Sequence, residues 1–97
     1  MKTLKEIKKI LTEHKPELKE KYQVNKIGIF GSYARNEQSK KSDLDILVDF
    51  KNPVGLFKQA GLWNYLDNIT KMKTDMVCFK KIRPELKKNI LHEVVYL

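Results

Sequence analysis

Two carboxylates spaced by one residue have the clearest chemistry in this sequence. Asp43 and Asp45 flank Leu44 at the start of an apolar run that continues to Phe50. Residues i and i+2 of a strand point to the same face with Cα atoms about 6.5 to 7 Å apart, so both carboxylates can converge on one or two hard cations. Without a cation or full exposure to water, the two charges repel each other. The pair therefore predicts a Mg²⁺ site whose metal also bridges substrate phosphates.

A third carboxylate, Asp75, stands at the polar start of another apolar run, Thr74 to Phe79. Two-metal phosphoryl-type transfer uses ions about 3.5 to 4 Å apart to stabilise both the entering and the leaving oxygen. In this interpretation Asp43 and Asp45 hold both ions, while Asp75 binds the catalytic ion and helps to activate the acceptor hydroxyl. A capped strand end is the alternative for Asp75.

A glycine-serine turn follows the apolar run Val24 to Phe30, and ten residues separate it from Asp43. Gly31 has no side chain, so a phosphate can approach the backbone N–H groups of the turn. Ser32 adds a hydroxyl that can contact the phosphate. The following residues can begin a helix, and we expect a short helix there whose dipole strengthens the anion site. An ordinary tight turn is the alternative, because Gly-Ser after a strand is a common pattern.

The elements that position these residues alternate between helix and strand. Thr3 and Glu6 resemble a capping box before a helical apolar pattern, and Pro16 and Pro84 stand where helices begin. Helices are expected over residues 3–14, 16–21, after 31, 56–69 and 84–94, and strands over residues 24–30, 44–50 and 74–79. This alternation predicts an α/β fold of two or three layers around a small sheet.

Length and composition favour one small domain. The 97 residues, of which 41% are hydrophobic, fit a single domain over residues 1–97. No apolar run approaches the roughly 18 residues of a membrane span, and no secretory signal pattern is present. A soluble, cytoplasmic protein is therefore expected.

The formal net charge of +8 is unevenly distributed. Residues 1–26 carry eight Lys against four Glu, and residues 71–97 carry seven Lys or Arg against three acids. Residues 27–50 carry three basic and four acidic residues, so the centre of the chain is net acidic. This reversal favours a cation site, whereas the basic ends fit nucleic acid, an acidic protein or a polyphosphate equally well. A solvated lysine-rich surface is the alternative for most of these lysines.

Three segments together resemble the minimal nucleotidyltransferase (MNT) group of the DNA polymerase β superfamily. The signature of this group is Gly-Ser, ten residues, Asp-x-Asp and a later acid. The matching segments are Gly31-Ser32-Tyr33-Ala34-Arg35, Ser42-Asp43-Leu44-Asp45-Ile46-Leu47-Val48 and Thr74-Asp75-Met76-Val77, and the likeness covers nearly the whole chain. The resemblance implies an α/β (α+β) nucleotidyltransferase fold, with a mixed β-sheet of about three to four strands flanked by helices.

The resemblance also implies ATP as the substrate, Mg²⁺ as the cofactor with two ions expected, and a role for each matching residue. The implied catalytic and metal-binding residues are Asp43, Asp45 and Asp75, and the implied nucleotide-binding residues are Gly31, Ser32 and Arg35. For Arg35 a surface arginine is the alternative. Asn36 departs from the family, which usually has Gly there. Because Asn tolerates a left-handed backbone, we expect the turn to persist.

Members similar to this chain often act as antitoxins paired with a HEPN-domain RNase, and transfer AMP from ATP to a tyrosine of that toxin. The resemblance therefore implies a HEPN-type partner. The length of the chain agrees with the need for such a partner, because 97 residues leave little chain for a domain that binds a second substrate.

Two other functions stay open. The first is nucleotidyl transfer to RNA, such as a tRNA 3′ end, which the basic ends motivate; the second is a non-catalytic antitoxin that only masks its partner. The C-terminal run Val94 to Leu97 is either a docking patch, for a second copy or for a toxin, or ordinary core packing, and packing is preferred.

Overall fold

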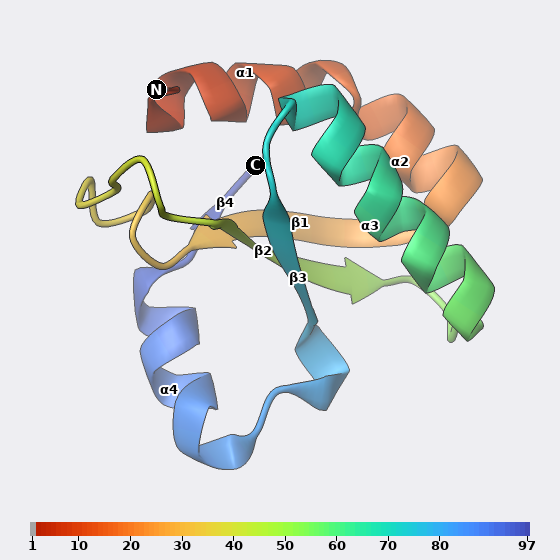
Figure 1. Cartoon of the computed structure of the whole chain (residues 1–97). Helices are drawn as coiled ribbons and strands as arrows, with labels where there is room; N and C mark the ends of the chain where they lie inside the picture. The colour runs from red at the N-terminus through yellow and green to blue at the C-terminus, as the bar shows by residue number, and fades with distance from the viewer. Residues whose placement is uncertain (1) are drawn as a thin grey trace.

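The computed structural model describes residues 2–97. Within them the elements follow in the order α1 (Leu4–Glu13), α2 (Lys15–Tyr22), β1 (Val24–Phe30), β2 (Leu44–Phe50), α3 (Leu56–Thr70), β3 (Thr74–Cys78), the 3-10 helix η1 (Phe79–Lys81), α4 (Pro84–Glu93) and β4 (Val95–Tyr96). The strands form one mixed sheet in the order β3-β2-β1-β4 (Figure 1). Strand β2 is antiparallel to β1 and parallel to β3, and β4 is antiparallel to β1. The predicted α/β fold with a small mixed sheet is confirmed.

The helices cover the two faces of the sheet unequally. Helices α1, α2 and α3 lie together on one face, and α4 stands alone on the other (Figure 1). The largest fully buried side chains between the sheet and the first three helices are Ile7, Leu11, Leu18, Ile29, Leu44, Ile46, Leu62 and Leu66. Since successive strand residues point to opposite faces, Asp45 points away from this core, toward the side of α4.

Local signals set where several helices begin and end. The N–H of Glu6 donates to Thr3 Oγ1, and the N–H of Thr3 donates to Glu6 Oε1, so the predicted capping box is confirmed. Prolines lie in the first turns of α2 and α4, where the missing N–H costs no hydrogen bond. Gln23 ends α2 in the left-handed conformation.

The prediction of a short helix after Gly31 is wrong. Residues 31–36 form turns. The N–H of Arg35 does donate to the Gly31 carbonyl at 3.1 Å, as in one helical turn. Asn36 then adopts a φ of 59°, the left-handed conformation predicted for it, and this stops the helix after a single turn.

Two predictions near the C-terminus are refined. The third strand ends at Cys78, because Phe79 begins η1. Val95 and Tyr96 form β4 against Ile29 and Gly28, and the N–H of Leu97 donates to the Ile27 carbonyl at 3.1 Å. The C-terminal run therefore packs as an edge strand, as preferred from the sequence.

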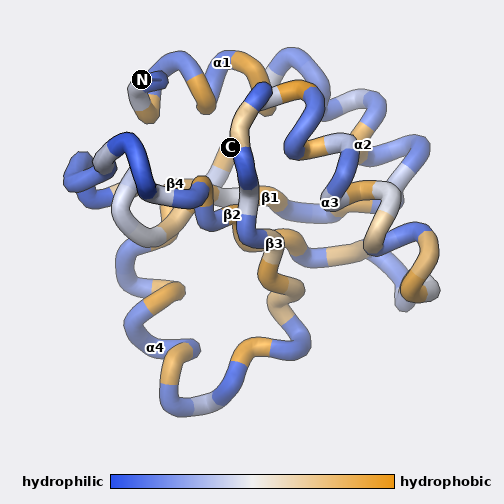
Figure 2. Tube along the Cα trace, viewed as in Figure 1, coloured by the Kyte–Doolittle hydropathy of each residue, from blue (hydrophilic) through white to orange (hydrophobic). Residues whose placement is uncertain are grey.

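The loop between β1 and β2 differs in character from the elements around it. It is mostly hydrophilic, whereas hydrophobic residues gather on the strands and along one side of the helices (Figure 2). Within residues 2–97 no helix has the length and apolar composition needed to cross a membrane.

Candidate active site

The three predicted carboxylates lie at the edge of the sheet where β2 and β3 begin. Asp43 directly precedes β2, and Asp45 is its second residue. Because β2 and β3 are parallel and in register, Asp45 pairs with Asp75, the second residue of β3. On its other side Asp45 pairs with Phe30, where β1 ends. The sheet register thus brings the ends of three strands, and the acids on two of them, to one place.

These carboxylates differ in exposure and charge environment. Asp43 and Asp75 are exposed, and Asp45 is partly buried. Burial raises the pKa of Asp45 to about 6, with further increases from the charges of Asp75, Asp43 and Glu93 and an opposing decrease from Arg35. The negative charge around Asp45 is therefore only partly compensated by protein groups.

This environment fits a hard divalent cation. All three side chains offer carboxylate oxygens, which Mg²⁺ prefers, and a cation would relieve the repulsion that adds to the effect of burial on the pKa of Asp45. Among residues 2–97, however, no three Asp, Glu, His or Cys side chains are already gathered as a metal-binding group. Side-chain rotation of Asp43 or Asp75, both exposed, would have to complete the ligand set.

Gly31 lies directly against Asp45. Its φ is 74°, a conformation that side chains with a Cβ rarely adopt. A Cβ on Gly31 would collide with Oδ2 of Asp45 and lie 2.9 Å from its Cγ. Glycine at this position therefore lets the turn after β1 approach the acidic cluster.

The turn after Gly31 has backbone donors available for an anion. Within residues 2–97 we observe no hydrogen bond from the N–H groups of Ser32, Tyr33 or Ala34. Tyr33 anchors the turn, because its side chain is buried in the core cluster. Successive free N–H groups in a tight turn form a concave site for phosphate oxygens. The turn can therefore hold an anion without the predicted helix.

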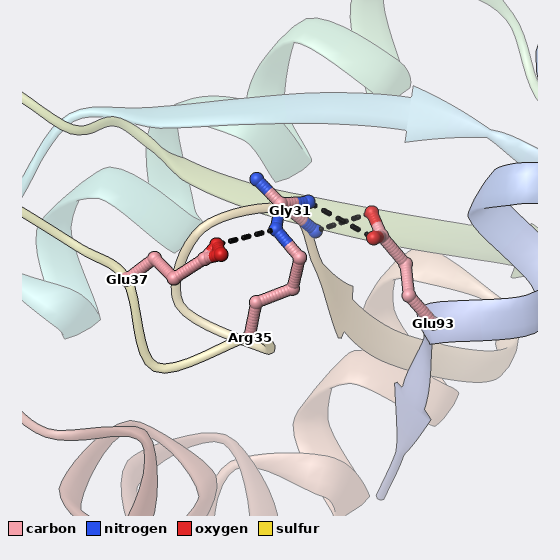
Figure 3. A network of polar contacts seen from close by, with 4 residues as sticks. All are labelled: Gly31, Arg35, Glu37 and Glu93. Atoms are coloured by element: carbon pink, nitrogen blue, oxygen red, sulfur yellow. Dashed lines mark hydrogen bonds and ion pairs between the residues drawn. The ribbon is translucent and has the colours of Figure 1, made fainter.

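Sequence reasoning missed one residue of this site, Glu93 at the end of α4. Its Oε1 accepts a hydrogen bond from the N–H of Gly31 at 2.9 Å, and its Oε2 is 2.9 Å from Nη1 of Arg35 (Figure 3). Arg35 also contacts Glu37, with 3.2 Å between Nε and Oε2. Glu93 lies 62 residues from Gly31 in the sequence, and no local pattern predicts that α4 would bring it there.

Asp43 also borders a surface hollow that is rich in lysines. A hollow of about 460 Å³ is lined by Lys2, Tyr33, Ser39, Lys40, Lys41, Ser42, Asp43, Lys71, Met72 and Lys73. Asp43 is the single carboxylate in this lining. A concave basic surface raises the local concentration of anions, so the approach to Asp43 favours a negatively charged molecule.

A family model and several named relatives match this chain. The family model described as a nucleotidyltransferase domain matches residues 11–97. The chain belongs to the nucleotidyltransferase family. It is 51% identical over 98 residues to a Methanocaldococcus jannaschii protein provisionally named protein adenylyltransferase MJ0126, with all of both chains covered. It is 44% identical over 97 residues to protein adenylyltransferase MntA of Thermococcus cleftensis, covering 100% of this chain and 98% of the relative.

Solved structures share the fold. One, described provisionally as a minimal nucleotidyltransferase, has a TM-score of 0.79 and 27% identity, with 99% of this chain and 97% of that chain covered. Another, a tri-AMPylated Shewanella oneidensis HEPN toxin in complex with MNT antitoxin, has a TM-score of 0.61 and 19% identity, with 96% and 66% covered. The chain is therefore a nucleotidyltransferase with the minimal form of the fold, and its near relatives carry the name of protein-modifying enzymes.

Proposed function

We propose that this nucleotidyltransferase is an antitoxin that transfers AMP from ATP, with Mg²⁺, to a tyrosine hydroxyl of a HEPN-type toxin. The observation that carries the proposal is the sheet register, which pairs Asp45 with Asp75 at the edge of the sheet where Asp43 and the Gly31 turn also lie. The names of the relatives support a protein as the acceptor. The complex of an AMPylated HEPN toxin with MNT antitoxin supports the class of partner.

In the proposed reaction the acceptor oxygen forms a bond to the α-phosphorus of ATP. The bond from that phosphorus to the bridging oxygen breaks, and pyrophosphate leaves with the electron pair. When bound by Asp43, Asp45 and Asp75, Mg²⁺ supplies positive charge that stabilises the transition state. The N–H groups of the Gly31 turn and the guanidinium of Arg35 orient the triphosphate. The carboxylate of Asp75, exposed at the start of β3, takes the proton of the acceptor hydroxyl.

The test is transfer of label from ATP labelled at the α-phosphate, in lysate of the source cells and with a purified HEPN-type protein of the same source. The Asp43→Asn, Asp45→Asn double variant should lose transfer by about 100-fold or more, because two of the three metal-binding charges are removed. Asp49→Asn is the matched control, since Asp49 lies on the same strand and face but pairs with Lys26, away from the Gly31 turn. Circular dichroism would show that all variants fold.

The outcomes separate the candidate functions. Label on one protein, lost in the double variant and kept in Asp49→Asn, supports the proposal. Unchanged transfer in the double variant overturns the mechanism. Neutralisation of the toxin that survives the double substitution would instead identify an antitoxin that masks its partner without catalysis.

RNA is the second candidate for the acceptor, and the lysine-lined hollow beside Asp43 favours it. Contacts between lysines and phosphates release counterions, so RNA binding should weaken steeply with salt. Label that appears on RNA and is lost at high salt would make RNA the acceptor. Binding of RNA that is absent or insensitive to salt would exclude this candidate.

A further inference from the structure

Glu93 connects the C-terminal helix to two parts of the nucleotide site. One carboxylate oxygen accepts from the N–H of Gly31 at 2.9 Å, and the other pairs with Nη1 of Arg35 at 2.9 Å (Figure 3). The Glu93 side chain is 24% exposed, against 47% for Arg35. A partly shielded pair with short, charge-assisted hydrogen bonds holds its geometry better than a fully exposed one.

The guanidinium of Arg35 lies between two carboxylates but keeps donors free. Nε contacts Glu37 and Nη1 contacts Glu93. A guanidinium carries five N–H donors in one plane, so these two contacts leave most of its donors for a further anion. Without them a long arginine side chain would sample many rotamers, and ordering it on phosphate binding would cost entropy.

Glu93 adds a fourth carboxylate to a region that already holds Asp43, Asp45 and Asp75. Its charge lies close enough to Asp45 to contribute to the raised pKa of that carboxyl. The helix that carries Glu93 has no buried residue, and one residue, Val94, separates it from the short strand β4.

We propose that Glu93 is a positioning residue for the triphosphate: it holds Arg35 and the Gly31 turn in the arrangement that receives ATP. This inference rests on the proposed nucleotidyl transfer, since it concerns the same nucleotide site. Docking of α4 and β4 against the sheet thereby becomes a condition for tight ATP binding. If Glu93 instead occupied the donors that the phosphates need, its substitution would tighten ATP binding rather than weaken it.

The test measures binding of an ATP analogue with a methylene group between the α- and β-phosphates, with Mg²⁺, by isothermal titration calorimetry on the full chain. No acceptor is needed. Glu93→Gln keeps an oxygen for the N–H of Gly31 but loses the charge that pairs with Arg35, and should raise the Kd about tenfold. Glu93→Ala loses both contacts and should raise it further. The matched control is Glu85→Gln, which removes one exposed charge at the start of the same helix and should leave the Kd within about twofold.

A double-mutant cycle with Arg35→Ala shows whether Glu93 acts through Arg35. If it does, Glu93→Gln has almost no further effect on the Kd in the Arg35→Ala background. Additive effects would overturn the positioning role. Tighter binding by Glu93→Gln would also overturn it and identify Glu93 as a competitor of the phosphates.

The same variants separate this inference from the proposed function. If the wild-type chain binds no ATP analogue, both fail. If the cycle behaves as expected while label transfer survives the loss of Asp43 and Asp45, the role of Glu93 stands and the proposed catalytic mechanism fails. A melting temperature unchanged in Glu93→Gln alongside a raised Kd would exclude a merely structural role.

Discussion

At the scale of single residues, Gly31 matters both for the backbone conformation of the turn and for the position of the Asp45 carboxylate. It combines a φ of 74° with direct contact to Asp45. Gly31→Ala should therefore destabilise the fold by about 1 to 2 kcal/mol through backbone strain, and should also displace the Asp45 carboxylate and abolish label transfer. Thermal unfolding and the transfer assay measure the two effects.

Gly55→Ala is the matched control for this prediction. Gly55 caps α3 with a φ of −71°, and a Cβ there would meet no heavy atom within 4 Å. Its substitution places a poorer N-cap residue at the start of α3, so it should cost at most about 1 kcal/mol of stability and leave transfer intact. Transfer at the wild-type rate by Gly31→Ala would contradict the role given to the close approach of Gly31 and Asp45.

Asp45 should make the stability of the metal-free protein depend on pH. The fold raises the pKa of Asp45 from 3.8 to about 6, so between these values the folded state binds more protons than the unfolded chain. Stability therefore falls as the pH rises through this window. Because Asp45 is partly exposed, the loss should be about 1 kcal/mol rather than the roughly 3 kcal/mol of an unscreened shift. In EDTA, Asp45→Asn should melt higher than the wild type at pH 7 and equally at pH 3.5, and the reverse order at pH 7 would contradict the prediction.

At the scale of elements, the start of β3 is fixed by helix α3. Oδ1 of Asp67 accepts hydrogen bonds from the N–H of Thr74 at 2.8 Å and from its hydroxyl at 2.6 Å. Thr74 is 2% exposed and precedes Asp75, so this contact sets where the third carboxylate emerges.

Asp67→Ala should destabilise the fold by about 2 to 3 kcal/mol, because two buried donors lose their acceptor. It should also lower the rate of transfer by displacing Asp75. Chemical denaturation measures the first effect and the label assay the second. Asn68→Ala, at the exposed neighbouring position on the same helix, is the control and should stay close to the wild type. Equal losses of stability and transfer rate in the two variants would contradict the role of Asp67.

The sequence predicted these elements well wherever the signal is local. The capping box at Thr3, the prolines that open α2 and α4, and the apolar runs of β1 and β2 depend on neighbours a few residues apart. The turn after Gly31 was predicted as a helix because its composition permits one. The left-handed conformation of Asn36, itself predicted, ends the helical turn after one turn, because a residue with positive φ cannot continue a right-handed helix. The contact of Glu93 with Gly31 depends on how α4 and β4 return to the sheet, so no local pattern could predict it.

At the scale of the whole molecule, the chain separates its charges. Asp43, Asp45 and Asp75 lie at one edge of the sheet, and five lysines surround the adjoining hollow. Other lysines, including Lys5 and Lys9, lie on the exposed side of α1. Since the field of a charge cluster acts over about 10 Å at 0.1 M salt, only lysines near the site should influence an approaching anion.

Lys40→Gln with Lys41→Gln should therefore slow transfer at low salt by about tenfold, through weaker attraction of the negatively charged substrate. The effect should shrink near 1 M salt, where the screening length is about 3 Å. Lys5→Gln with Lys9→Gln removes the same net charge from α1 and should change the rate by less than about twofold. Initial rates of label transfer over a range of salt concentrations measure both pairs. Equal slowing by the two pairs would mean that total charge, rather than the basic hollow beside Asp43, governs the approach of the substrate.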